Sequence, residues 1–316
     1  MQLALHLVGR FADSLTPLWP ERGTLGVAVS GGPDSLALLL LVAQAFPGQV
    51  EAATVDHGLR AESAGEAQFV AQVCAGLGVA HSVLGVSVAA GNVQSEARDA
   101  RYAALAGWMA ERSIGALATG HHADDQAETL LQRLNRASGV SGLAGVRTRG
   151  LVPGTRLPLL RPLLTWRRLE LEAVVQAAGL EPVRDPSNDD ARFDRVRLRK
   201  ALAEADWLNV DAVAASATHL ADADQALDWA AAREWREQVE QSGLGVIYRP
   251  MAPRAVALRV LARIVRDLGE DEARGGALAR LFDALVQGKT ASIGQLVVRP
   301  AQGGWQFMPA PKRRGG

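Results

Sequence analysis

Cysteine and lysine are scarce in this chain. Its 316 residues include one cysteine, Cys74, and three lysines. A single cysteine excludes a disulfide framework within the chain and any metal cluster built from its cysteines alone. Because arginine is the usual cation here, an isolated arginine is weak support for a phosphate-binding surface.

Long apolar runs and a net charge are also missing. The run Leu36–Val42 is far shorter than the ~20 apolar residues that span a bilayer. The N-terminus has no basic segment that leads into an apolar run with a cleavage site. We therefore expect a cytoplasmic protein without a membrane segment. The net charge of zero argues neither for nor against nucleic acid as a partner.

Positive charge is nevertheless concentrated in one stretch. Residues 131–200 hold 14 Lys and Arg side chains against seven Asp and Glu. Such a local excess can bind nucleic-acid phosphates on an otherwise neutral protein. A solvated, arginine-rich surface is the alternative.

From residue 25 to residue 136 the chain alternates short apolar segments with segments of helical spacing. We expect strands at 25–29, 50–55, 81–88 and 114–119, and helices at 34–46, 62–77, 94–111 and 124–136. This alternation predicts an α/β fold with a doubly wound parallel sheet. Ligands of such sheets bind at the C-terminal ends of the strands.

The second half of the chain reads differently. Residues 138–162 are rich in glycine, proline and arginine and predict a long loop. We expect helices at 166–178, 195–205, 212–241, 253–268 and 276–287, and a terminal hairpin of strands at 293–298 and 305–308. The pattern changes near residue 208. We therefore predict a catalytic domain at 1–207 and a mostly helical C-terminal domain with a small β hairpin at 208–316.

The segment Ser-Gly-Gly-Pro-Asp-Ser at 30–35 follows the first expected strand. Glycines let the backbone approach phosphate oxygens, and the first N–H groups of the next helix point at them. The segment lacks the Gly-Lys-Ser/Thr of a Walker A loop and the spacing of a dinucleotide fingerprint. Asp34 would repel phosphates unless it holds a Mg²⁺ ion that they share. A plain turn capped by Asp34 is the alternative.

This segment resembles the PP-loop of N-type ATP pyrophosphatases, which cleave ATP to AMP and pyrophosphate to adenylate an oxygen. The resemblance implies an adenine-nucleotide α-hydrolase-like, Rossmann-like fold, with ATP and Mg²⁺ as cofactors. The ATP-binding residues that it implies are Ser30, Gly31, Gly32, Asp34, Ser35, Asp56 and His57. A structural role for His57 is nearly as well supported.

Later motifs, taken in order, are similar to those of tRNA(Ile)-lysidine synthetases. The most specific is His121-His122-Ala123-Asp124-Asp125-Gln126-Ala127-Glu128-Thr129, and the others include Arg101-Tyr102, Gly142-Leu143-x-Gly145, Arg161-Pro162-Leu163-Leu164, Asp185-Pro186-Ser187-Asn188 and Arg195-x-Arg197-Leu198-Arg199. The resemblance covers residues 1–200 and is weaker beyond. Two positions depart from the usual pattern: Ala137 replaces a glycine, and Val196 replaces an asparagine, so no role is transferred to position 196.

The resemblance implies a two-step reaction. The wobble cytidine of a tRNA(Ile) with a CAU anticodon is adenylated on its C2 oxygen, and the ε-amine of free L-lysine then displaces AMP. Asp125 and Glu128 would share a helix face. These carboxylates could bind the lysine ammonium, with one of them or His121 accepting its proton. The alternatives are an acidic cluster that complements the helix dipole, or a metal site formed by both histidines and Asp125.

Other residues receive more general roles. Arg101 is a candidate to stabilise negative charge on the adenylate or pyrophosphate, or else a surface arginine. Asp185 and Asn188 would complete the lysine and cytidine pocket, or else cap a helix. Arginines expected to contact tRNA are Arg133, Arg136, Arg195, Arg197, Arg199, Arg259 and Arg263.

Three other functions compete with this one. A tRNA thiolase of the same superfamily normally needs a second cysteine, which the chain lacks. An amidotransferase-linked synthetase needs a glutamine-hydrolysing partner or domain. A non-catalytic RNA-binding protein would not need Ser30, Asp34, His121, Asp125 and Glu128 together. The sequence leaves the oligomeric state open, with a homodimer as one option.

Overall fold

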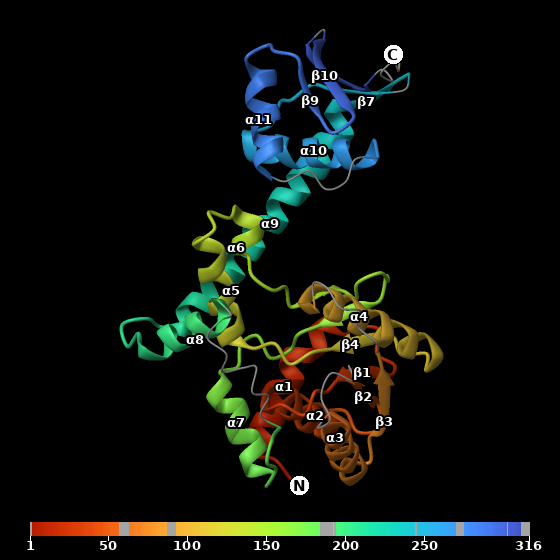
Figure 1. Ribbon diagram of the computed structural model, residues 1–316, viewed down its shortest axis with the longest axis vertical. Coiled ribbons are helices and arrows are strands. Elements are labelled where there is room, and N and C mark those ends of the chain that lie inside the picture. Colours follow the sequence, from red (N-terminus) through yellow and green to blue (C-terminus); the bar gives the residue numbers. More distant parts are fainter. Residues whose placement is uncertain are drawn as a thin grey trace. The chain divides into compact units, whose positions relative to one another are not determined.

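The computed structural model describes residues 2–56, 63–86, 93–183, 192, 194–243, 245–269, 275–301 and 303–310. The chain forms two compact units, Met1–Ala221 and Asp222–Gly316, which are described separately (Figure 1). Helix α9, Val210–Gln238, contributes to both. The predicted domain boundary near residue 208 lies just before α9. Because α9 belongs to both units, this boundary stays a prediction.

The first unit contains a six-stranded sheet in the order β3-β2-β1-β4-β6-β5. Its strands are β1 Leu25–Ala28, β2 Val50–Asp56, β3 Ala80–Gly85, β4 Ala116–Ala118, β5 Arg149–Leu151 and β6 Pro158–Leu160. All neighbours are parallel except β5, which runs antiparallel to β6. The predicted α/β fold with a parallel sheet is confirmed. The strand order reverses between β1 and β4, which is where sheets of this kind bind ligands.

Helices cover both faces of this sheet. Figure 1 shows α2, Pro33–Ala45, and α3, Ser63–Leu77, on one face and α4, Val93–Glu111, on the other. Every residue of α2 from Ser35 to Val42 is buried. A helix that is apolar all round needs cover on every side. The sheet covers one side of α2. Two further helices pack on the opposite side of α2, namely α1, Leu5–Leu15, and α7, Arg168–Ala177.

Two parts of the first unit were not predicted. The first is α1, which is followed by a short 3₁₀ turn at Thr16–Leu18. Arg10 connects α1 to the start of α7, because its guanidinium pairs with Glu170 in the first turn of α7 at 2.5 Å and lies 4.1 Å from the ring centroid of Trp166, just ahead of that helix. Phe11 and Leu15 of α1 are also buried in the hydrophobic core.

The second is the segment 138–162, where the prediction of one long loop was wrong. This segment contains the short helix α6, Val140–Leu143, and strands β5 and β6. The burial of Leu159 and Leu160 places β6 firmly in the sheet beside β4. Three-residue strands between glycines and prolines carry no measurable periodicity, so the sequence pattern could not reveal them.

The first unit is completed by two helices before α9. These are α5, Ala123–Leu134, which follows β4, and α8, Asp194–Glu204. They contact each other, so α8 brings its arginines to the acidic residues of α5.

The second unit has a five-stranded antiparallel sheet in the order β7-β8-β11-β10-β9. Its elements after α9 are β7 Val239–Ser242, β8 Gly245–Tyr248, α10 Arg254–Asp267, α11 Gly275–Val286, β9 Ala291–Ile293, β10 Leu296–Ala301 and β11 Gly304–Pro309. The terminal hairpin is confirmed as β10–β11. Buried Glu234 of α9 accepts hydrogen bonds from the Tyr248 hydroxyl and from the N–H groups of Met251 and Ala252.

Candidate active site

The loop between β1 and α2 is closed by its own serines. The Ser35 hydroxyl donates to the carbonyl of Gly32 at 3.0 Å and accepts from the N–H of Ser30 at 3.1 Å. Gly31 has φ +83°, a conformation that favours glycine. Pro33 starts α2, and Asp34 lies in its first turn. The loop therefore presents the N-terminus of a buried helix, which favours an anion.

The chain after β4 lies directly against this loop. A Cβ atom on Gly120 would lie 2.9 Å from the backbone oxygen of Asp34. The atoms in the way belong to the backbone, so no side-chain rotation can make room. Gly120 thus allows the ends of β1 and β4 to lie close together.

We expect Gly120→Ala to push the phosphate loop out of place. Overpacking of this kind costs roughly 1–3 kcal/mol of stability, and ATP affinity should fall with it. Gly107→Ala is the matched control, because a Cβ there meets nothing within 4 Å. Calorimetric ATP titration of both variants checks this, and wild-type affinity in G120A would contradict the close approach.

His121 is a neutral histidine at the end of β4. Its Nδ1 lies 3.0 Å from the Thr119 hydroxyl oxygen. Burial lowers the pKa of His121 to about 4, and the positive charges of Arg161 and Arg101 act in the same direction, against the raising effect of Asp125. At pH 7 the ring therefore stays uncharged and has one nitrogen that accepts and one that donates a hydrogen bond.

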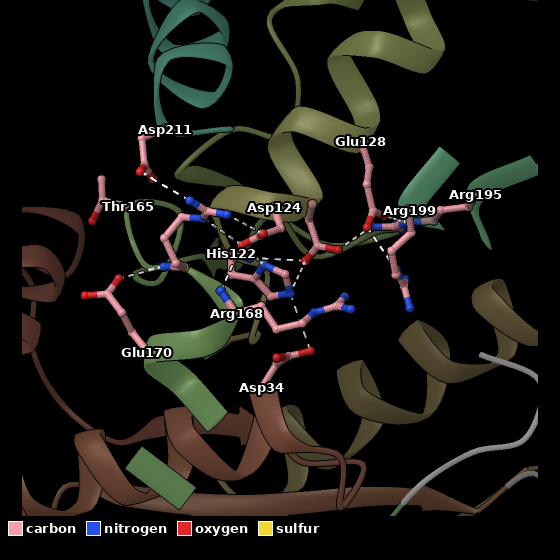
Figure 2. Close-up of polar contacts among 12 residues, drawn as sticks. Asp34, His122, Asp124, Glu128, Thr165, Arg168, Glu170, Arg195, Arg199 and Asp211 are labelled. Atoms are coloured by element: carbon pink, nitrogen blue, oxygen red, sulfur yellow. Dashed lines mark hydrogen bonds and ion pairs between the residues drawn. The ribbon is translucent and has the colours of Figure 1, made fainter. Parts of the chain in front are cut away.

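His122 is fully buried, caps α5 and lies among three carboxylates, as Figure 2 shows. Its Nε2 lies 3.5 Å from Oδ2 of Asp34 and 3.6 Å from Oδ2 of Asp125, and its Nδ1 lies 3.5 Å from Oδ2 of Asp124. Burial by itself would lower the pKa of His122. The three facing carboxylates outweigh it and raise the pKa to about 9. His122 is therefore an imidazolium at pH 7.

This raised pKa predicts a pH dependence of stability. The folded protein keeps a proton on His122 that the unfolded chain releases above pH 6.5, so the stabilisation is complete below pH 6.5. It is lost as the pH rises toward 9, by at most about 3 kcal/mol. Urea unfolding between pH 6.5 and 9 measures the slope. His122→Gln should flatten it, and an unchanged slope in H122Q would assign the effect to other groups.

Asp124 is the most firmly held of the three carboxylates. It accepts hydrogen bonds from Nη2 of Arg167 at 3.1 Å and from the N–H of Arg168 at 2.8 Å. Burial opposes its ionisation, but His122, Arg167 and the Arg168 amide together lower the pKa of Asp124 far below its usual value. Arg167 also pairs with Asp211 at the start of α9, at 3.3 Å (Figure 2).

Asp125 and Glu128 lie on one face of α5 and are paired with arginines of α8. Figure 2 shows Glu128 beside Arg195 and Arg199. Arg195 contacts both carboxylates and donates through Nε to Glu128 at 2.7 Å. Arg199 donates to the other oxygen of Glu128 at 3.0 Å. Burial would raise the pKa of Asp125, but the charges of His122 and Arg195 lower it. This carboxylate pair, called the cation site below, holds the guanidinium groups of Arg195 and Arg199 in this structure.

Arg101 and Arg161, whose charges act on His121, have unused hydrogen-bond donors. The Nε atoms of Arg101 and Arg161 are buried and have no hydrogen-bond partner among the described residues. The guanidinium groups of Arg98 and Arg101 each lie 5.2 Å from the ring centroid of Tyr102. Arg161 follows β6 and donates to the carbonyl of Arg147 at 2.8 Å. Buried guanidinium groups with unused donors can bind phosphate oxygens.

The remaining predicted residues are spread over both units. Asp56 ends β2, close to the phosphate loop in the fold because β2 pairs with β1. His57, Asp185 and Asn188 lie outside the described residues. Arg133 is exposed in the last turn of α5, and Arg136 is exposed just after it, 3.7 Å from Asp194, which Arg197 also contacts.

In the second unit, the two predicted arginines are already engaged. Arg259 pairs with Asp228 at 2.5 Å and also contacts Asp224. Arg263 lies 3.9 Å from the Trp235 ring centroid and 3.5 Å from Asp267.

Sequence reasoning missed three residues of this site. His122 appeared there only as a metal-ligand alternative, and Asp124 and Arg167 had no role. Within the described ranges, no group of three or more His, Cys, Asp or Glu side chains is arranged to hold a metal ion. The sequence did contain a signal for His122. It stands directly before two aspartates at the predicted start of a helix, and an imidazole at that position lies close to their carboxylates.

Comparison with known proteins agrees with these features. Residues 5–206 match the PP-loop domain family. The chain is 49% identical over 309 residues to a tRNA(Ile)-lysidine synthase of Novosphingobium aromaticivorans, covering 96% of this chain and 94% of that protein. It is 42% identical over 307 residues to the synthase of Zymomonas mobilis, covering 93% and 91%.

A solved structure supports the fold. The U34-tRNA thiolase NcsA from Methanococcus maripaludis superimposes with a TM-score of 0.55 at 16% sequence identity, covering 68% of this chain and 78% of that one. No helix in the described part of the chain is long and apolar enough to cross a membrane. The phosphate loop, the acidic start of α5 and the close relatives lead to one conclusion: the chain belongs to the tRNA(Ile)-lysidine synthase family, whose PP-loop domain binds ATP.

Proposed function

We propose that this enzyme joins free L-lysine to C2 of the wobble cytidine of tRNA(Ile) with a CAU anticodon. The C2 oxygen attacks the α-phosphate of ATP and releases pyrophosphate. The ε-amine of lysine then attacks C2, and the C2–O bond breaks to release AMP. The observation that carries the proposal is that Asp34 of the phosphate loop and Asp125 of the cation site face one imidazole at 3.5 and 3.6 Å.

The first step is supported by the groups around the phosphate loop. The N-terminus of α2 is available to phosphate oxygens, and the hydroxyls of Ser30 and Ser35, 3.3 Å apart, lie in the loop ahead of it, with the Ser35 hydroxyl donating to Gly32 in this structure. The unused donors of Arg101 and Arg161 are suited to the charge that develops on the departing pyrophosphate. Asp56 is placed for the adenosine, a role that rests on the family resemblance.

Asp34 also fits a Mg²⁺ ion. Its Oδ1 is buried and has no hydrogen-bond partner among the described residues, and carboxylate oxygens are preferred ligands of Mg²⁺. When bound, the ion would neutralise part of the charge on the ATP phosphates. The role of the protein is to hold this carboxylate beside the helix N-terminus.

The second step is supported by the cation site. Asp125 and Glu128 pair with the guanidinium of Arg195, so the two carboxylates suit a cation, and a lysine ammonium would take the place of that arginine. Asp125, Glu128 and His121 remain the candidates to accept the proton that the ammonium must lose before attack, and the lowered pKa of His121 makes its imidazole a weak base for this step. We assign Asp185 and Asn188 to the lysine and cytidine pocket on the family resemblance alone.

Sulfur transfer is a poorer fit. Cys74 is the one cysteine of the chain, it is fully buried, and burial raises the pKa of its thiol to about 11. A thiol that is neither ionised nor accessible cannot relay sulfur.

We infer a cytoplasmic location from the proposed substrates, tRNA and free lysine. A homodimer stays a proposal.

The reaction can be tested with an unmodified tRNA(Ile) transcript that carries the CAU anticodon. We expect pyrophosphate release to need tRNA, and lysidine formation to need lysine as well. Asp34→Ala should reduce pyrophosphate release by at least about 100-fold, since it removes a group that acts on the charge of the transition state. Asp13→Ala, an exposed carboxylate of α1, is the control. Activity with a sulfur donor in place of lysine would overturn the proposal.

The tRNA contacts can be tested separately. Arg133 and Arg136 are exposed, so we expect the double variant R133Q/R136Q to weaken tRNA binding for every sequence. The slope of log affinity against log salt should fall by roughly two. Arg259→Gln should instead lower the stability of the second unit, because Arg259 bridges Asp224 and Asp228. Filter binding over a salt series and thermal melting distinguish the two. An unchanged salt slope would remove Arg133 and Arg136 from the interface.

A further inference from the structure

One imidazole lies between the two halves of the proposed reaction. Nε2 of His122 faces Asp34, which belongs to the phosphate loop after β1, and Asp125, which belongs to the first turn of α5. These carboxylates come from segments about 90 residues apart in the sequence, and this ring nitrogen is close to both (Figure 2). The opposite nitrogen, Nδ1, faces Asp124 alone among the described carboxylates.

The ring has little freedom to move. It is fully buried at the start of α5, and the backbone N–H of His122 donates to Oδ2 of Asp125 at 3.1 Å. Asp124, on the Nδ1 side, is itself fixed by Arg167 and by the N–H of Arg168. Nδ1 therefore faces a carboxylate that is itself held in place, and Nε2 faces the two proposed reactive carboxylates.

We propose that His122 is a positioning residue that holds the carboxylates of Asp34 and Asp125 at a fixed separation through Nε2. The inference rests on the proposed function, in which Asp34 serves adenylation and Asp125 holds lysine. His122 touches neither substrate in this account. Neither ring nitrogen has a hydrogen-bond partner among the described residues, so Nε2 acts on both carboxylates through charge, at 3.5 and 3.6 Å. In this way His122 keeps the C2 position of the tRNA adenylate within reach of the bound lysine. Such supporting residues typically change activity about 10- to 100-fold when they are replaced.

A matched pair of variants separates the two ends of the ring. The side-chain amide of asparagine occupies the region of Nδ1, and the longer glutamine amide reaches the region of Nε2. H122N therefore keeps a group toward Asp124 and loses the contacts with Asp34 and Asp125. H122Q keeps a group toward the two reactive carboxylates. If His122 served only as the cap of α5, H122N would keep more activity than H122Q, or the two variants would be equally active.

The experiment uses the full chain with tRNA(Ile), ATP and lysine. Pyrophosphate release is followed without lysine for the first step, and the KM for lysine and kcat are measured for the second. We expect H122N to lose about 10- to 100-fold in the first step and to raise the KM for lysine by a similar factor. H122Q should lose distinctly less in both. The control is His6→Gln, an exposed histidine of α1, which should behave as wild type.

The possible outcomes separate this inference from the proposed function. If wild type forms no lysidine, the proposed function fails. If wild type forms lysidine but H122N equals it, or if H122N and H122Q lose equally, only the positioning role fails. A loss confined to one step would also overturn it, because one ring atom is proposed to serve both.

A second measurement does not depend on replacing a buried residue. The full-length protein labelled with ¹⁵N-histidine gives separate signals for Nδ1 and Nε2 of His122. Asp34→Asn and Asp125→Asn should each shift the Nε2 signal, and Asp124→Asn should shift Nδ1. If neither D34N nor D125N moves the Nε2 signal, the ring does not hold these carboxylates, and the proposal is wrong.

Discussion

The rest of the site depends on three carboxylates that surround one buried imidazole, because their charges must be compensated. Ionised carboxylates are costly to bury unless cations and hydrogen bonds satisfy them. His122 compensates Asp34, Asp124 and Asp125 from the centre, and Arg167 and Arg195 add positive charge from α7 and α8. Removing the ring would leave like charges facing one another. The positions of α5, α7 and α8 therefore follow from charge compensation as much as from apolar packing.

The sheet makes this arrangement possible. Because the strand order reverses between β1 and β4, the segments that follow these two strands leave the same edge of the sheet as neighbours. Gly120 permits the close approach, since any side chain there would collide with the backbone of Asp34. The phosphate loop and the acidic start of α5 then lie side by side, as the proposed reaction with an adenylate intermediate and an amine nucleophile requires.

Much of this could be predicted from the sequence, and the failures have physical reasons. The alternation of strands and helices predicted the parallel sheet, and the motif at 30–35 predicted the anion site, because both depend on residues close together in the chain. Strand β6 was missed because three residues show no periodicity. The pairing of Arg195 and Arg199 with Glu128 was also out of reach, since it joins helices about 70 residues apart in sequence. Of the two adjacent histidines, the sequence could not say which one faces the carboxylates, because that depends on where α5 begins.

The central claim is that one site activates the C2 oxygen of a cytidine and then replaces that oxygen with an amine. A tRNA(Ile) whose wobble cytidine carries ¹⁸O at C2 tests it most directly. Mass spectrometry of the nucleotides after one turnover with ATP and lysine should find the label in AMP. Label that remains in the tRNA, or that appears in pyrophosphate, would contradict the account.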